Sequence, residues 1–500
     1  MRYLLFIILF VTSTLTLFSK SKLDSLVSIG NEQSFQFNFI KAEKTFKTII
    51  ELFPESSIGY YLISRNSLWF YLANKDSSSK NKFNKFYKIA LTKAEKEFEN
   101  DSENALVNYN LGNIYFLNSI FNSSEKNSMD AFWSTKSALG YFEDAIDLDK
   151  NYYAPRLPLG TIQYALGFVP GFLGWAISIA GLEGDKLGGL ENIKLAYYNC
   201  KSCKAEAAYH LGKIYTEYNA MYDKAEDLLS KIVKEYPQNE LFLYQYAILQ
   251  IDKRQLKKAE EILNHIIYEI PNPNFIQTYA LSMFLKGEVL FKQNRFKEAI
   301  EEYEHFIAKT SSPDYTGISN LKIALSYEML NEKLQAQKHY ILARNGNLNI
   351  AEDFDANERS QKYFDLMFSD NDKLIIKANN FLESGKYLDA NETLEKFDTK
   401  KMTKEAQFNS DLVKIDAFQN MNKFDKSLDV LNKYKDNSKF EGYKEFPKYL
   451  YLKSLQEFND KKYSDSNDTF KLALNSIHDS DNKLQRLLVN LSMKLAKIKE

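Results

Sequence analysis

The sequence predicts an all-α protein, an α-solenoid of about eleven antiparallel helix pairs that stack into a curved superhelix. The first observation is composition. The 500-residue chain contains only 9 Pro and 18 Gly, too few turn-forming residues for a protein built from many short strands. The second is a repeat, in which small residues recur in pairs twelve positions apart and aromatic residues follow them at helical spacing. The third is length, because one hydrophobic core rarely serves so many residues.

The clearest repeat contains Gly287 and, twelve residues later, Ala299, followed by Tyr303 and Phe306. Two antiparallel helices approach closely only where a side chain without bulk allows it, so the two small residues mark a helix crossing. This unit resembles the tetratricopeptide repeat. The same twelve-residue pairing recurs at Gly30 and Ala42, Ala247 and Ala259, Ala324 and Ala336, Ala378 and Ala390, Ile415 and Ser427, and Ser454 and Ser466. Gly212 and Ala225 form a further pair with one extra residue in the turn.

Two units are expected to carry long insertions between their helices. One insertion is predicted around residues 122–130, between the helix containing Gly112 and the helix containing Ala138. The other is predicted at the Ser-Ser-Ser-Lys stretch, residues 77–80, which follows the helix containing Ser64. Proline cannot continue a helix, and prolines stand at the expected ends of three units, at Pro54, Pro237 and Pro271.

Residues 1–20 have the pattern of a secretory signal. A basic residue, Arg2, precedes an apolar run over residues 3–18 that only small hydroxyl residues interrupt. We therefore expect an exported protein, periplasmic or associated with the cell envelope. An uncleaved anchor helix is the alternative, because the run approaches the length that spans a bilayer.

The remaining chain is predicted to form an N-terminal array over residues 21–240 and a C-terminal array over residues 241–500. The first array contains an uncharged segment, residues 164–182, that is long enough to span a membrane. Gly167, Pro170 and other helix-weakening residues within it favour a buried or surface-docked hydrophobic insertion instead.

A narrower resemblance covers residues 167–190. The run Gly167-Phe-Val-Pro-Gly-Phe-Leu, the stretch Ile179-Ala-Gly-Leu-Glu-Gly-Asp-Lys and the start Gly188-Gly-Leu of the next helix are similar to the central signature of another family. That tetratricopeptide family includes a fungal inclusion-body clearance protein and its animal relatives. The resemblance implies a helical hairpin here and implies nothing about cellular role.

The two cysteines, Cys200 and Cys203, have the spacing of a redox motif, but no βαβ pattern surrounds them. Two thiols near a helix junction or a local disulfide bridge are the favoured alternatives. The chain carries 65 basic and 66 acidic residues in interspersed order, which argues against a nucleic-acid-binding face.

No catalytic, metal or cofactor site is predicted, so the chain is not expected to be an enzyme. The histidines lie in different units without metal-ligand spacing. The glycine-rich stretch 184–189 lacks the order of a phosphate-binding loop, and Asp185 is expected to cap the helix that follows. The paired carboxylates Glu260-Glu261 and Glu301-Glu302 are expected on solvated helix faces.

Stacked helix pairs present a concave groove lined by the first helix of each pair. If the repeat positions are right, the groove is lined by Tyr109, Asn113, Phe116, Tyr209, Lys213, Tyr244, Phe284 and Glu288. Rings mixed with polar groups suit an extended peptide, although the rings could equally fill the spaces between units. We therefore predict an exported scaffold that binds protein or peptide partners in the cell envelope. The alternative is a glycan- or lipid-binding protein that uses residues 164–182, with membrane association through that segment or the N-terminus.

Overall fold

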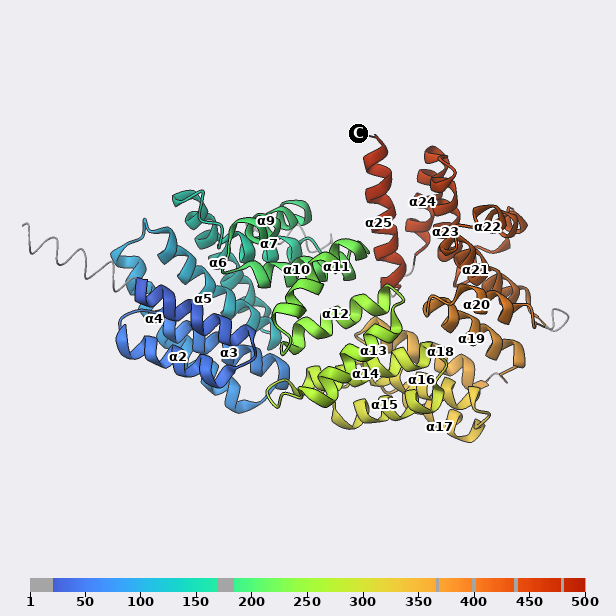
Figure 1. The fold of residues 1–500 in the computed structure, drawn as a ribbon, viewed down its shortest axis with the longest axis horizontal. Helices are drawn as coiled ribbons and strands as arrows, with labels where there is room; N and C mark the ends of the chain where they lie inside the picture. The colour runs from blue at the N-terminus through green and yellow to red at the C-terminus, as the bar shows by residue number, and fades with distance from the viewer. Residues whose placement is uncertain are drawn as a thin grey trace, which may run out of the picture. The chain divides into compact units, whose positions relative to one another are not determined.

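The computed structural model describes residues 21–168, 184–365, 368–397, 402–435, 439–477 and 481–499. All regular structure in these ranges is helical, which confirms the predicted fold class. The described residues form two compact units (Figure 1). The first unit takes in the chain up to Gly212, together with Leu228–Phe242 and Pro273–Phe275, and the second takes in the rest. The predicted division at residue 240 stays a prediction.

The first unit is a stack of antiparallel helix pairs. It begins with a helix over residues 21–35. The following helices are α2 (Phe39–Leu52), α3 (Ile58–Asn74), α4 (Ser77–Asn100), α5 (Ala105–Ser124), α6 (Ser128–Leu148), α7 (Arg156–Leu166) and α9 (Lys186–Asn199). Three more helices, α10 (Lys204–Glu217), α11 (Tyr222–Glu235) and α12 (Glu240–Asp252), contribute residues to both units.

The second unit continues the same pattern. Its helices are α13 (Leu256–Asn264) with the π-helical turn η1 (His265–Glu269), α14 (Ile276–Lys292), α15 (Phe296–Lys309), α16 (Thr316–Met329), α17 (Lys333–Ala343) and α18 (Ala351–Asp365), then α19 (Asp370–Glu383) and α20 (Tyr387–Leu394). The chain ends with α21 (Lys404–Asn420), α22 (Phe424–Leu431), the short 3-10 turn η3 (Asn432–Tyr434), α23 (Phe446–Asn459), α24 (Tyr463–Ser476) and α25 (Asn482–Lys499).

The predicted crossing residues lie where neighbouring helices touch. A Cβ atom added to Gly287 would lie 2.9 Å from two ring atoms of Tyr303 on the next helix. Ser454 and Ser466, twelve residues apart, are fully buried, and the hydroxyl of each donates to the backbone carbonyl of the other at 2.7 and 2.8 Å. The small side chains therefore set the closeness of each helix pair, as the repeat spacing predicts.

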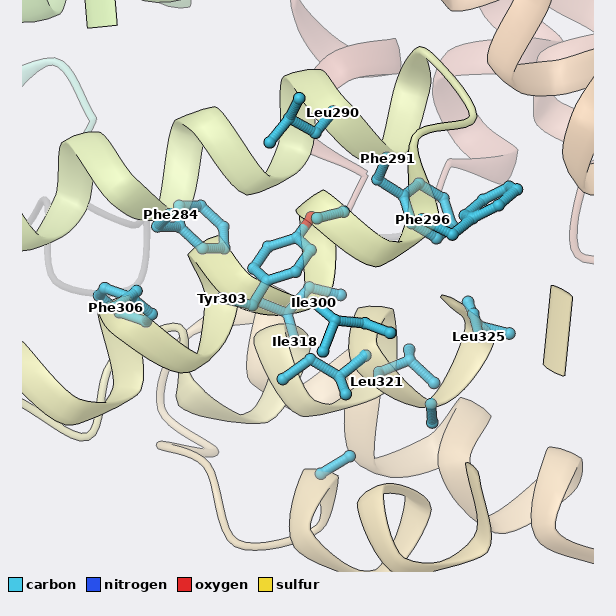
Figure 2. Close-up of a cluster of buried hydrophobic side chains, with 14 of the residues drawn as sticks. Phe284, Leu290, Phe291, Phe296, Ile300, Tyr303, Phe306, Ile318, Leu321 and Leu325 are labelled. Atoms are coloured by element: carbon cyan, nitrogen blue, oxygen red, sulfur yellow. The ribbon is translucent and has the colours of Figure 1, made fainter. Parts of the chain in front are cut away.

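Aromatic side chains fill the space between these crossings. In the second unit, Tyr303 and Phe306 are fully buried and Phe284 nearly so, within the cluster that Figure 2 shows. The ring of Phe284 lies 5.4 Å from that of Phe306 and 5.1 Å from that of Tyr315, which belongs to the following helix pair. The core thus continues from one pair to the next, as expected of stacked repeats.

The two predicted insertions are wrong. Residues 77–80 form the first turn of α4, where the side chain of Asp76 accepts a hydrogen bond from the backbone N–H of Ser79 at 2.8 Å. Residues 122–124 end α5 and residues 128–130 begin α6, so only a short turn separates them. The extra residues lengthen the helices by whole turns instead. These turns bury their own apolar side chains, such as Phe83 of α4 and Phe121 of α5, whose rings lie 4.8 Å apart.

Helix ends follow the predicted signals elsewhere. Pro54, Pro237 and Pro271 lie just beyond α2, α11 and η1. Asp185 caps α9, because its carboxylate accepts hydrogen bonds from the backbone N–H groups of Leu187 and Gly188 at 3.0 and 2.8 Å.

The hydrophobic segment 164–182 lies mostly outside the described residues, because the structure describes nothing from 169 to 183. The narrower family resemblance and the predicted insertion fall on the same stretch and stay predictions. The signal at residues 1–20 is outside the described part as well. Among the residues that are described, no helix combines the length and apolar character needed to cross a bilayer.

The last helix, α25, ties the end of the second unit to its beginning. Its residues Leu484 and Leu488 are buried in the core that it shares with α23. Arg486 pairs with Asp252 of α12 at 2.9 Å, and the side-chain amide of Asn490 donates to the backbone carbonyl of Asn219 at 3.2 Å. These contacts join residues more than 200 positions apart, so they connect the last helix of the second unit to the first helices of the same unit.

Candidate ligand-binding groove

The first unit contains a cavity of about 1100 Å³. The helix over 21–35, α3, α5, α7 and the start of α10 contribute lining residues, and these are the first helices of successive pairs. The cavity therefore occupies the surface that a repeat stack uses as its concave face. Its volume exceeds the range of about 300–1,000 Å³ that is common for small-molecule pockets, so it can hold several residues of a peptide.

A regular set of residues forms the floor of the cavity. On each of four helices, the residues three positions before and one position after the small crossing residue line it. The eight residues, which we call the groove stripe, are Val27 and Asn31, Tyr61 and Arg65, Tyr109 and Asn113, and Leu157 and Thr161. They flank Gly30, Ser64, Gly112 and Gly160 respectively. Positions four apart lie on one face of a helix, so the stripe follows from helical geometry.

The two tyrosines of the groove stripe, Tyr61 and Tyr109, have raised pKa values. Burial raises the pKa of Tyr61, and the nearby Arg65 opposes that rise. Burial also raises the pKa of Tyr109, against a hydrogen bond from Asn113, and Glu206 of α10 raises it further. Both phenols therefore remain protonated at neutral pH and can donate as well as accept hydrogen bonds.

Arg65 is the cation of the groove stripe. Its guanidinium carbon lies 4.8 Å from the centre of the Trp69 ring, one turn further along α3. One terminal nitrogen reaches the amide oxygen of Asn66 at 3.4 Å, and the buried Nε has no hydrogen-bond partner. Within the described ranges, Arg65 forms no ion pair with a carboxylate.

Three carboxylates also line the cavity. Glu97 is already engaged, since it accepts hydrogen bonds from the backbone N–H and the hydroxyl of Ser57 at 2.9 and 2.6 Å. Asp24 and Glu206 come from the first described helix and from α10. The groove thus offers separate charges of both signs among apolar and aromatic surface.

A disulfide forms part of the cavity wall. Cys200 and Cys203 are bonded, with their Cα atoms 5.4 Å apart, at the junction between α9 and α10. Both residues line the cavity together with Ser202. The local bridge, one of the two favoured alternatives from the sequence, is the one that the structure contains.

The predicted groove residues fall into different places. Tyr109, Asn113 and Phe116 line the cavity. Tyr209 packs on the ring of Phe242 with the centroids 5.5 Å apart, and Tyr244 is half-buried on α12. That these five residues bind a ligand stays a prediction.

The other three predicted groove residues belong to the second unit. Lys213 pairs with Glu217 of its own helix at 3.0 Å, and Phe284 is buried in the core. Glu288 accepts a hydrogen bond from Tyr303 and lies 3.5 Å from the ammonium group of Lys322. Lys213, Phe284 and Glu288, which the sequence analysis placed in the groove, thus contact other residues of the second unit. That they bind a ligand stays a prediction.

The sequence also contained a signal for the groove residues that were not predicted. Tyr61 and Arg65 have the same offsets from Ser64 as Tyr109 and Asn113 have from Gly112. Applying that offset to every repeat would have found the whole groove stripe.

Some carboxylates of the second unit are not where they were predicted. Glu302 is buried rather than solvated, and it pairs with the ammonium group of Lys286 at 2.8 Å. Glu260 lies 2.7 Å from a terminal nitrogen of Arg295. Among the described residues, no group of three or more His, Cys, Asp or Glu side chains is arranged to hold a metal ion.

Comparison with known proteins agrees with this architecture. The tetratricopeptide-repeat sequence family matches residues 218–281. This part of the chain is therefore similar to tetratricopeptide repeats. The comparison with curated proteins found no match to this chain.

The comparison with solved structures finds similar chains of low sequence identity. The P58(IPK) TPR domain is 15% identical, with 83% of this chain and 94% of that chain covered and a TM-score of 0.23. Yeast Tom70 is 14% identical, with 96% and 89% covered and a TM-score of 0.33. The APC/C hetero-tetramer Cut9–Hcn1 is 10% identical, with 95% and 98% covered and a TM-score of 0.26. Likeness at this level says nothing about what the chain binds.

Proposed function

We propose that this chain is a non-catalytic scaffold that binds a protein partner as an extended peptide in the groove of the first unit. The observation that carries the proposal is the cavity of about 1100 Å³ whose floor is the groove stripe. Tetratricopeptide repeats generally bind protein partners, and their concave face is the surface that stacking leaves open.

The proposal includes export to the cell envelope. The apolar run over residues 3–18 after Arg2 supports export. The disulfide between Cys200 and Cys203 also supports it, because such bonds persist in oxidising compartments.

Site-specific photo-crosslinking in the native cell tests this function. A photoreactive residue at Tyr109 should form a crosslink to a partner, identified by mass spectrometry of the crosslinked peptide. The matched control is Tyr198 of α9, which is not among the residues lining the cavity and is 77% exposed, so greater accessibility favours the control. If Tyr198 crosslinks as well as Tyr109, or if Tyr109 yields no protein partner, the proposal is wrong.

A further inference from the structure

The groove of the first unit contains a guanidinium group that forms no ion pair with a carboxylate of the described residues. Arg65 has a buried Nε without a partner, one 3.4 Å hydrogen bond to Asn66 and a ring contact to Trp69. Arg156 of α7 also has a buried Nε without a partner, but its guanidinium donates to the amide oxygen of Asn192 on α9 at 2.9 Å, and it does not line the cavity. Arg65 is therefore positioned toward the groove rather than used to hold two helices together.

The carboxylates of the groove do not neutralise Arg65 directly. Glu97 is held by Ser57, and neither Asp24 nor Glu206 forms an ion pair with Arg65 in the described structure. Arg65 is only partly buried, so water reaches its guanidinium while the groove is empty. A ligand that covers it removes that water, and an unpaired buried charge is costly. A ligand that fills this groove must therefore bring an anionic acceptor of its own.

The polar groups around Arg65 favour a peptide over an acyl chain. Asn31, Asn113 and Thr161 reach the cavity from three different helices, and the amide oxygen of Asn31 is buried without a partner. A hydrocarbon chain laid over these groups would desolvate them without replacing their hydrogen bonds. An extended peptide presents an N–H and a C=O at each residue, so it can satisfy amide and hydroxyl groups along the groove.

The position of Arg65 shows where the anion lies in the ligand. The cavity lining continues along α3 on both sides of it, through Ile58 and Tyr61 toward one end and to Trp69 toward the other. A ligand that fills the groove thus extends past Arg65 in both directions. A carboxylate at that point belongs to a side chain within the segment rather than to its C-terminus.

We propose that the groove recognises an extended segment of a partner protein in which apolar residues flank one Asp or Glu side chain, whose carboxylate binds Arg65. A guanidinium can hold a carboxylate through two parallel hydrogen bonds, which selects for an acid by geometry as well as charge. The inference rests on the proposed function, since it specifies the peptide that the groove binds.

Selection from a peptide library tests it with the full-length protein. A random twelve-residue library displayed at the N-terminus of a carrier protein has no free C-terminal carboxylate, so any acid selected is a side chain. The wild-type protein should enrich peptides with Asp or Glu at one internal position. Arg65→Glu should enrich Lys or Arg at that position. Lys136→Gln on α6, which removes an exposed charge away from the cavity, should select the same peptides as wild type.

Affinity of one selected acidic peptide provides the second measurement. Arg65→Gln should weaken binding about 10- to 100-fold, the usual effect of losing a hydrogen bond to a charged group. The same peptide with Gln in place of its acid should bind wild type and Arg65→Gln with nearly equal affinity, because the two changes remove one interaction. Circular dichroism and thermal unfolding establish that each variant is folded.

The outcomes separate the two proposals. Peptides that bind the groove without an acidic residue, or whose selection Arg65→Glu leaves unchanged, would overturn the Arg65 inference and leave the proposed function standing. If acidic peptides are enriched only from a library with free C-termini, then Arg65 binds a C-terminal carboxylate and the assignment of the anion to an Asp or Glu side chain is wrong. If no peptide is enriched, the proposed function itself fails. If oleate alone binds in an Arg65-dependent way, the groove is a lipid site and both proposals are wrong.

Discussion

A close backbone contact between two helices of the first unit allows a sharp test of how the repeats pack. Gly189 of α9 faces Gly160 of α7, and a Cβ atom added to Gly189 would lie 2.7 Å from the carbonyl oxygen of Gly160 and 2.7 Å from the backbone nitrogen of Tyr164. Backbone atoms cannot rotate away as a flexible side chain can. Gly189→Ala must therefore push α9 away from α7.

The magnitude follows from two opposing effects. Overpacking of a tight contact costs about 1–3 kcal/mol. Because the atoms in the way belong to the backbone, the upper part of that range applies, about 2–3 kcal/mol. Replacing Gly by Ala inside a helix returns about 1 kcal/mol, so we expect a net loss of roughly 1–2 kcal/mol. The control is Gly140→Ala on α6 in the same unit, where the added Cβ would meet no atom within 4 Å. That variant should gain roughly 0.5–1 kcal/mol, since only the helix-forming effect remains.

Native-state hydrogen exchange read by mass spectrometry is the suitable assay. Repeat arrays can unfold in parts, so a single global transition does not isolate one helix pair. Amides of α7 and α9 should exchange about tenfold faster in Gly189→Ala for each 1.4 kcal/mol lost, and amides of α6 should exchange more slowly in Gly140→Ala. Equal protection of α7 and α9 in Gly189→Ala and wild type would refute the packing argument.

Three further predictions concern buried charges and the disulfide. The Asp252 side chain is 10% exposed and desolvation raises its pKa, which Arg486 opposes, so Arg486→Gln should cost roughly 3–5 kcal/mol at neutral pH. This loss of stability should become smaller as the pH falls toward 3.8, the ordinary pKa of an Asp, because the carboxylate of Asp252 in the folded variant then binds a proton and loses its unpaired charge. Urea unfolding measures the loss, and a loss that does not change with pH would contradict the prediction. Burial lowers the pKa of His339 to about 4. Between pH 6.5 and 4 this imidazole therefore binds a proton in the unfolded state and stays neutral in the folded state. The free energy of unfolding should therefore decrease as the pH falls from 6.5 to 4, and it should decrease less in His339→Gln. If the free energy of unfolding depends on pH equally in His339→Gln and wild type, the prediction is wrong. Purified native protein should take up no alkylating reagent at Cys200 and Cys203 until it is reduced, and two adducts without reduction would show that the bridge is absent.

Much of the helical architecture could be predicted from the spacing of residues that are close together in the sequence. Gly287, Ser454 and Ser466 lie at helix contacts because spacing along a helix and the need for small side chains at a crossing are properties of neighbouring residues. The same reasoning failed between α3 and α4 and between α5 and α6. There, extra residues were read as loops, although a helix can lengthen by whole turns without disturbing its crossing point.

Contacts between segments that are far apart in the sequence could not be predicted from it. Nothing near Asp252 in the chain indicates that Arg486, 234 residues later, will pair with it. The pairing exists because α25 returns to the beginning of the second unit, and that return depends on the accumulated geometry of all the helix pairs between them.

The groove shows the same division. The sequence determined which residues occupy the inner face of each first helix, because Tyr109 and Phe284 both stand three positions before a small crossing residue. Only the tertiary structure decided that Tyr109 lines a cavity while Phe284 is buried against Tyr303, Phe306 and Tyr315. The periodicity of a helix is local, whereas the space in front of its inner face depends on how closely the next pair packs.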